Sequence, residues 1–165
     1  AELSGDVRLQ ILGSGPEEFA LKQLAQDLGI SGKVEFLGAV EPEQIPHYLL
    51  QATIFARPSR SEGLGNSFLE AMAAGLPVIG TAVGGIPDFL KDYNANDVKE
   101  DANYANGLFV RVDDSKDLAE KIGLLVSDSS LRERLGRAGR ELVLRNYSWD
   151  IIAKKMSNIF LFPKP

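Results

Sequence analysis

Residues Thr53–Gly80 read TIFARPSRSEGLGNSFLEAMAAGLPVIG and predict a strand–loop–helix–strand unit. The β-branched and aromatic residues of Thr53–Ala56 predict a strand, which the next proline ends. After a loop of small and polar residues, Asn66–Ala74 predicts a helix, and Gly75 is well placed to end it. The short run Pro77–Gly80 predicts the next strand. Because helical crossovers join parallel strands, this stretch predicts a parallel sheet with helices on both faces.

The same alternation continues on both sides of this unit. Further strands are predicted at Val7–Leu12, Lys33–Leu37 and Gly107–Val112, and further helices at Glu17–Leu28, Pro42–Leu50, Ser115–Ser127, Ser130–Arg145 and Ser148–Phe160, with a short helix near Ile86-Pro87. Residues Lys91–Asn106 are rich in Asn, Asp and Lys and predict an exposed loop. The fold class is therefore α/β, with a Rossmann-like parallel sheet. No repeat or domain boundary is visible, so residues 1–165 are expected to form a single domain.

Apolar stripes predict the buried faces of three helices. Residues spaced at i, i+3, i+4 and i+7 lie on one side of a helix, which is then expected to face the core. The stripes are Leu21, Leu24, Ala25 and Leu28 in the first helix, Leu131, Leu135, Ala138 and Leu142 in the next to last, and Trp149, Ile152, Met156 and Ile159 in the last.

Composition excludes several classes of function. The net charge of −5 argues against a nucleic-acid-binding protein that works by bulk positive charge. The absence of cysteine excludes disulfide scaffolds and thiolate sites, and a single histidine, His47, leaves little room for a histidine metal site or a catalytic triad. Capping of the following helix by Ser115, with favourable acids in its first turn, explains the cluster Asp113, Asp114 and Asp117 without a cation. No apolar run approaches the roughly 20 residues of a membrane span, and no secretory signal opens the chain, so a cytoplasmic location is expected.

The loops at the carboxyl ends of the strands are where an open parallel sheet binds its ligand. In one of them, Gly63 and Gly65 allow close approach of a ligand to the backbone, and the helix that follows offers amide groups suited to phosphate. Glu62 precedes this helix and Glu70 lies about one turn inside it. Their carboxylates suit a sugar ring and a ribose diol, respectively. The alternative is that Glu62 is a solvated loop charge and Glu70 an acid favoured by the helix dipole.

The complete set of motifs resembles a known family. It consists of Pro58-Ser59, Glu62–Gly65, Leu69–Ile79 and Gly84–Asp88, together with Gly13–Pro16, Phe36–Gly38 and Tyr147–Trp149. These motifs resemble the C-terminal, donor-binding half of retaining glycosyltransferases that have two Rossmann-like domains (the GT-B fold), in particular the family-4 enzymes of glycosyl transferases group 1. The resemblance covers nearly the whole chain. The start at Ala1 is consistent with a piece of a longer enzyme of this kind.

The resemblance implies a nucleoside-diphosphate sugar as donor and retaining transfer to an acceptor hydroxyl, for example in polysaccharide biosynthesis. It implies that Glu62 is catalytic and contacts the donor sugar, and that Glu70 binds the ribose. The other implied donor-binding residues are Gly13, Gly15, Gly38, Val40, Gly63, Leu64, Gly65 and Asn66, with Gly38 and Val40 near the nucleobase. No metal or cofactor is implied. Alternatives are a nucleotide-sugar epimerase of the same architecture and a nucleotide-binding module without turnover.

One departure from the family concerns the start of the sheet. The family begins this half with another strand in the middle of the sheet, followed by a loop whose Arg and Lys neutralise the leaving diphosphate. No such pair precedes Val7, and the acceptor-binding domain, through which any membrane association is expected, is absent as well. A break in the sheet is therefore expected, with a changed strand order or a partner strand. Arg57 and Arg60 lie in the right loop for phosphate but are expected to be solvated.

Overall fold

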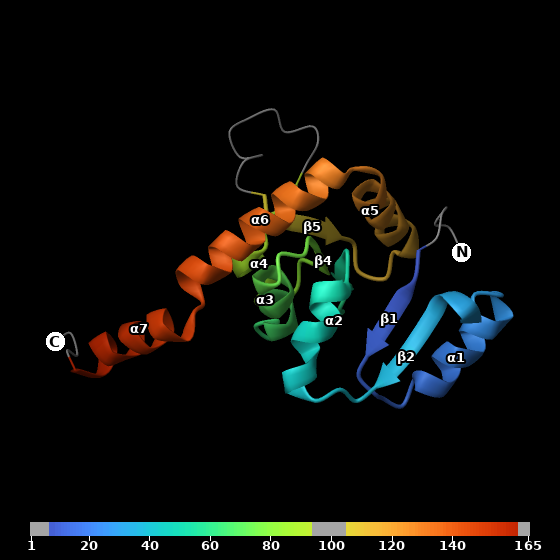
Figure 1. Ribbon diagram of the computed structural model, residues 1–165, viewed down its shortest axis with the longest axis horizontal. Helices are drawn as coiled ribbons and strands as arrows, with labels where there is room; N and C mark the ends of the chain where they lie inside the picture. The colour runs from blue at the N-terminus through green and yellow to red at the C-terminus, as the bar shows by residue number, and fades with distance from the viewer. Residues whose placement is uncertain (1–6, 94–104, 162–165) are drawn as a thin grey trace. The chain divides into compact units, whose positions relative to one another are not determined.

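The computed structural model describes residues 7–93 and 105–161 and divides the chain into two compact units, residues 1–48 and 49–165 (Figure 1). Helix α2 (Ile45–Gln51) carries the chain from the first unit to the second. The parallel strands correspondingly form two sheets, a pair with the order β1-β2 and a triplet with the order β3-β4-β5. Removing strand 1 from the doubly wound order 3-2-1-4-5-6 leaves a pair and a triplet, as observed. The alternative of a changed strand order is therefore wrong, and a partner strand stays a prediction.

The first unit contains β1 (Leu9–Leu12), α1 (Glu18–Asp27), the 3₁₀ turn η1 (Ser31–Lys33), β2 (Val34–Gly38) and the 3₁₀ turn η2 (Pro42–Gln44). The two strands pair in parallel from Leu9 opposite Val34 to Leu12 opposite Gly38. Lys22 of α1 lies over the ring of Phe36, 5.4 Å from its centroid, which places the helix against β2.

The apolar stripe of α1 is mostly uncovered, contrary to the sequence prediction. Ala25 is buried, but Leu21, Leu24 and Leu28 remain 43%, 52% and 48% exposed. A pair of strands presents too little surface to cover a helix, and at least three strands with an apolar face are needed for a stable sheet. The stripe is therefore correct as an amphipathic pattern but wrong as a list of core residues.

The second unit contains β3 (Phe55–Arg57), α3 (Asn66–Ala73), β4 (Val78–Thr81), α4 (Ile86–Phe89), β5 (Gly107–Val110), α5 (Ser115–Ser127), α6 (Ser129–Asn146) and α7 (Trp149–Leu161). These bounds agree with the sequence predictions to within a few residues. Strand β4 lies between the other two, with Ile79 opposite Ala56 on one side and Leu108 on the other. Every residue of β4 is buried, as expected of a central parallel strand covered on both faces.

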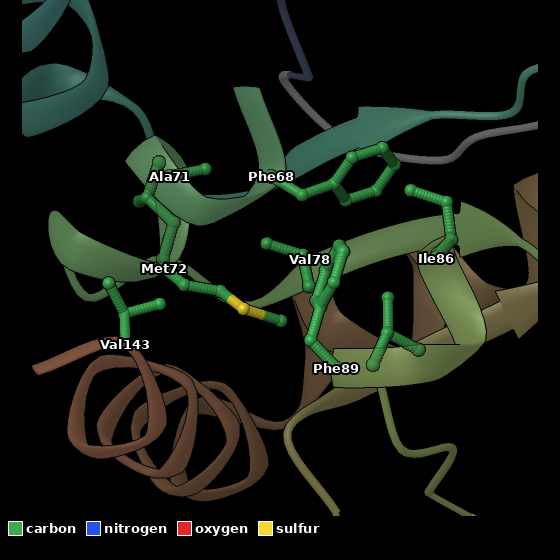
Figure 2. Packing of buried hydrophobic residues seen from close by; sticks show 9 residues of the cluster. Phe68, Ala71, Met72, Val78, Ile86, Phe89 and Val143 are labelled. Carbon is green, nitrogen blue, oxygen red and sulfur yellow. The ribbon is translucent and has the colours of Figure 1, made fainter. Parts of the chain in front are cut away.

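Successive residues of the sheet enter two different cores, because side chains alternate between the faces of a strand. Val78 belongs to a cluster with residues of α3 and α4, including Phe68, Met72 and Phe89 (Figure 2). Ile79 belongs to the cluster on the other face, which also contains Leu108, Val110, Leu125, Leu131 and Leu135. Helix α6 contributes to both clusters.

Two glycines bring α6 close to α3 and the turn that follows it. A Cβ atom on Gly136 would lie 2.1 Å from the carbonyl oxygen of Gly75, and one on Gly139 would lie 3.0 Å from Cγ of Met72. The buried seam of α6 therefore runs through these glycines and Val143, in addition to the predicted Leu131 and Leu135.

The predicted core stripe of α7 is wrong. Trp149, Met156 and Ile159 are 84%, 50% and 67% exposed. Helix α7 continues past the end of α6 and away from β3–β5 (Figure 1), so no part of the sheet is available to cover its apolar side.

The predicted exposed loop at Lys91–Asn106 lies partly outside the described residues. At its end, Asn106 is 2% exposed, which differs from the prediction. Its amide group donates to the carbonyl of Phe89 at 2.8 Å and accepts from the amide of Lys91 at 2.8 Å. Asn106 is thus a buried structural residue that ties β5 to the end of α4.

Candidate functional site

The loop between β3 and α3 carries the candidate site of the second unit. As predicted, Glu62 lies in this loop and Glu70 lies on the second turn of α3 (Asn66–Ala73). The side chain of Glu62 is 13% exposed, whereas Glu70 is an exposed residue. The two acids therefore flank the start of one helix, but their environments differ.

Glu62 is held by two side chains, so the alternative of a solvated loop charge is wrong. Arg57 places Nε 3.1 Å from Oε2 of Glu62, and the hydroxyl of Ser59 donates to the same oxygen at 3.1 Å. Arg57 also donates through Nη1 to Oγ of Ser67 at 2.9 Å. Both contacts to the carboxylate reach Oε2, which leaves Oε1 for a ligand.

The expectation of solvated loop arginines holds in part for both Arg57 and Arg60, since each is exposed but each is also paired with an acid. Arg60 places Nε 2.8 Å from Asp113, but its side chain is 80% exposed. The hydrogen bond that Arg60 donates to Asp113 raises the pKa of Arg60, which in any case stays charged. Arg60 thus makes a surface ion pair with Asp113.

The Gly84-Gly85 turn after β4 fixes the backbone of the Glu62 loop. The amide of Gly85 donates to the carbonyl of Gly63 at 2.9 Å. A Cβ atom on Gly84 would lie 1.8 Å from the carbonyl oxygen of Glu62, so only glycine fits there without movement of the loop. Thr81, which is 1% exposed, adds a hydrogen bond of 2.5 Å from its hydroxyl to the carbonyl of Ser59.

Sequence reasoning included the glycine pair in a family motif but missed Thr81. The position of Thr81 at the end of an apolar strand was a signal for this hydrogen bond, because a hydroxyl that is buried there requires a partner.

Gly65 shapes the start of α3. It adopts a left-handed conformation with φ of 78°, and a Cβ atom there would lie 2.5 Å from Cδ1 of Ile86. Gly65 has no side chain with which to cap the helix, and the amide of Phe68 donates to the carbonyl of Gly65 at 2.9 Å. The amides of Asn66 and Ser67 precede this first helical hydrogen bond and can donate to a ligand. Gly63 and Leu64 are exposed beside them. This geometry suits an anion.

The remaining predicted donor residues belong to the first unit. The structure brings Gly13 and Gly38 together, because the amide of Gly13 donates to the carbonyl of Gly38 at 2.7 Å. Both glycines have a positive φ, 116° and 67°. The carbonyl of Gly15 accepts from the amide of Glu18 at the start of α1, and Val40 is half-buried in the segment after β2.

The acidic cluster before α5 caps that helix, but through Asp114 rather than through the predicted Ser115. Asp114 accepts from the amide of Asp117 at 2.9 Å, and Arg111 places Nη2 2.8 Å from Asp114. The hydrogen bond from the Asp117 amide, aided by the Arg111 charge, lowers the pKa of Asp114. Within residues 7–93 and 105–161, no three His, Asp or Glu side chains are grouped so that they could hold a metal ion.

Across the part of the chain that the structure describes, no helix combines the length and apolar character needed to span a bilayer.

Three known proteins are similar to this chain. The GDP-mannose-dependent monoacylated alpha-(1-6)-phosphatidylinositol monomannoside mannosyltransferase of Corynebacterium glutamicum is 37% identical over 161 residues, which are 93% of this chain and 39% of that protein. Sucrose-phosphate synthase from Thermosynechococcus elongatus superposes with a TM-score of 0.80 at 28% identity, covering 93% of this chain and 38% of that one. Anabaena Alr3699/HepE in complex with UDP-glucose superposes with a TM-score of 0.83 at 20% identity, covering 97% and 42%.

The chain thus spans about two fifths of the length of the mannosyltransferase, and the likeness to Alr3699/HepE shows the fold. The model of the family described as glycosyl transferases group 1 matches residues 1–142, which is most of the sequence. This match agrees with the parallel α/β architecture and with the motifs around Glu62 and Glu70. The chain belongs to the glycosyl transferases group 1 family of GT-B glycosyltransferases.

Proposed function

We propose that this chain binds a nucleoside-diphosphate sugar, and that the full-length protein transfers the sugar with retention to an acceptor hydroxyl. The observation that carries the proposal is the fixed carboxylate of Glu62 next to the uncapped start of α3. One short loop thus carries a carboxylate, which can accept hydrogen bonds from sugar hydroxyls, and backbone amides, which can donate hydrogen bonds to phosphate oxygens. The similarity to the mannosyltransferase of Corynebacterium glutamicum, a GDP-mannose-dependent enzyme, supports the same donor class.

Glu62 is the proposed catalytic residue of this site, because it would touch the donor sugar. Its Oε2 is occupied by Arg57 and Ser59, so Oε1 would accept a hydrogen bond from a sugar hydroxyl. A hydrogen bond to a charged acceptor is worth about 1.5–3 kcal/mol. Such a contact would orient the sugar relative to the bond that breaks, which lowers the entropic cost of reaction.

The start of α3 is the proposed seat of the diphosphate. Amides of Gly63, Leu64, Gly65 and Asn66 would donate to phosphate oxygens, and the helix dipole favours negative charge there. Glu70 is exposed on the next turn, where its carboxylate would accept from the ribose diol. On the first unit, Gly13, Gly15, Gly38 and Val40 stay predicted donor-binding residues, the last two for the nucleobase.

In the proposed reaction, the bond between the anomeric carbon and the β-phosphate oxygen breaks, and the acceptor oxygen bonds to that carbon on the same face. The proton of the acceptor hydroxyl passes to the departing phosphate oxygen. The leaving group is the nucleoside diphosphate, whose negative charge grows as the bond breaks. Donors that are already oriented toward this charge stabilise the transition state. The α3 amides, together with Arg or Lys side chains of the longer protein, would supply them without a metal ion or cofactor.

Calorimetric titration of the full-length protein with uridine, guanosine and adenosine diphosphate sugars tests donor binding. The expected result is micromolar affinity for one nucleotide sugar, and product analysis by NMR should then show the retained anomeric configuration. Binding to no member of the panel would contradict the proposal. Interconversion of the sugar without an acceptor would favour an epimerase, and binding without turnover a nucleotide-binding module. A cytoplasmic location, with any membrane contact through the acceptor-binding domain, stays a prediction that cell fractionation would test.

A further inference from the structure

We infer that Arg57 is a positioning residue for Glu62, so that it controls how well the site distinguishes a nucleotide sugar from the nucleoside diphosphate alone. This inference rests on the proposed function of the loop. Arg57 is the last residue of β3, where it pairs with Gly80 of the buried strand β4. Its backbone is therefore fixed by the sheet, while its side chain extends over the loop that carries Glu62.

One guanidinium connects both ends of the turn that precedes α3. Nε of Arg57 lies 3.1 Å from Oε2 of Glu62, and Nη1 donates to Oγ of Ser67 at 2.9 Å. Ser67 is the second residue of α3, so the arginine links the loop carboxylate to the helix start. The planar guanidinium holds its donors in a fixed arrangement, and a lysine ammonium would not reproduce both contacts.

The exposure of the Arg57–Glu62 pair indicates that it orients the Glu62 carboxylate rather than stabilises the fold. The side chain of Glu62 is 13% exposed, while that of Arg57 is 50% exposed. Solvent screens a half-exposed ion pair, so its contribution to folding is small. Without Arg57, however, Oε2 would keep only the Ser59 hydroxyl among its two observed partners, and the carboxylate would be free to rotate. Oε1 would then no longer be directed to one position.

A direct contact between Arg57 and the diphosphate is the competing explanation, and it makes a different prediction. A phosphate contact would strengthen binding of the nucleoside diphosphate and of the nucleotide sugar equally. Orientation of Glu62 affects only the sugar, because the nucleoside diphosphate contains no group for that carboxylate to bind. Both recorded contacts of the Arg57 guanidinium go to protein oxygens, which favours orientation.

The test compares Arg57→Met, Arg57→Lys, Glu62→Gln and the Arg57→Met/Glu62→Gln double variant in the full-length protein that contains this chain. Arg145→Met is the matched control, because Arg145 pairs with Glu141 on the surface of α6 at 3.3 Å. Each variant is titrated calorimetrically with UDP, GDP and ADP and with their glucose and mannose esters. The thermal unfolding midpoint is recorded for each.

Arg57→Met is expected to weaken nucleotide-sugar binding about tenfold and nucleoside-diphosphate binding by less than about twofold. The nucleotide-sugar affinity of Arg57→Lys should lie between that of Arg57→Met and that of the native protein. Residues that act as a unit are not additive, so the double variant should bind no more than about twofold weaker than Glu62→Gln alone. Arg145→Met should bind both ligands as the native protein does.

If Arg57→Met weakened the binding of nucleotide sugar and of nucleoside diphosphate equally, the inference would be overturned in favour of a phosphate contact. Unchanged sugar binding, or additive losses in the double variant, would also overturn it. Failure of the native protein to bind any of the nine probes would instead contradict the proposed function. A crystal structure of Arg57→Met decides the positioning independently of any ligand: Glu62 in its original orientation would overturn the inference, and a rotated carboxylate would support it.

Discussion

Gly84 is in direct backbone contact with Glu62, since a Cβ atom on Gly84 would lie 1.8 Å from the carbonyl oxygen of Glu62. Gly84 also has a φ of 55°, a conformation that costs other residues energy. The turn after β4 and the loop after β3 are therefore assembled as one structure. The position of the Glu62 carboxylate therefore depends on Gly84, a residue that has no side chain with which to contact a ligand.

Gly84→Ala should lower the free energy of unfolding by about 1–3 kcal/mol, because the loop must move and the alanine must adopt a strained conformation. Nucleotide-sugar affinity should fall as well, since Glu62 moves with its carbonyl. Urea denaturation and calorimetric titration measure the two effects. Gly123→Ala is the control: it lies in α5 with open space around its Cβ position, so alanine should be neutral or stabilising there. Equal stability of Gly84→Ala and Gly123→Ala would show that the close contact is not rigid.

Glu70→Ala should weaken nucleoside-diphosphate binding about tenfold, because the ribose diol would lose a charged acceptor. The loss should be the same for the nucleotide sugar, in contrast to substitution of Arg57. Calorimetry with ribonucleoside and 2′,3′-dideoxyribonucleoside diphosphates distinguishes the diol contact from a general effect. Native protein should prefer the ribonucleotide, and Glu70→Ala should not. Glu133→Gln changes another exposed acid, on α6, and should leave the preference intact.

Asp114 should make stability depend on pH. Its pKa is lowered by the hydrogen bond from the Asp117 amide, so the folded state favours the charged carboxylate. The ordinary pKa of an aspartate is about 4. A carboxylate with a lowered pKa stabilises the folded state at pH values above that, and this stabilisation is lost as the pH falls through the pKa of the folded state. Asp114→Asn keeps a capping oxygen but removes the charge. Urea denaturation should show Asp114→Asn less stable than the native protein at pH 7, with the difference shrinking below about pH 4. A difference that grows in acid would contradict the assignment.

Local signals predicted the elements well, because each depends on residues near one another in sequence. The α5 bounds Ser115–Ser127 match the prediction, where an Asp cap precedes an amphipathic run. Periodicity alone, however, indicates only that one side of a helix is apolar. It could not show that the stripe of α7 at Trp149 and Ile159 is uncovered, because what covers a face depends on elements outside the helix.

The candidate site was predicted in part for a similar reason. The order of Glu62, the glycines and α3 follows from the chain itself. The pairing of Arg57 with Glu62 could not be predicted, because no periodic pattern distinguishes a paired loop arginine from a solvated one. The contact of Gly136 with Gly75 was also missed, since glycine carries no hydrophobic signal and the approach of two backbones is visible only in three dimensions.

The isolated 165-residue chain should not transfer sugar, although weak affinity for a nucleoside diphosphate is expected. The loop around Glu62 and the start of α3 are present, so part of the proposed donor site is formed. No Arg or Lys precedes Val7 in the isolated chain, and loss of a charged contact to the diphosphate costs on the order of 3 kcal/mol of transition-state stabilisation. No acceptor-binding domain orients a hydroxyl, and orientation accounts for up to roughly 7–11 kcal/mol in favourable cases. A radiolabelled-donor assay of the purified chain, with the full-length protein as positive control, measures the outcome. Acceptor-dependent product above the blank without protein would show that these residues contain more of the catalytic machinery than the loop and helix described here.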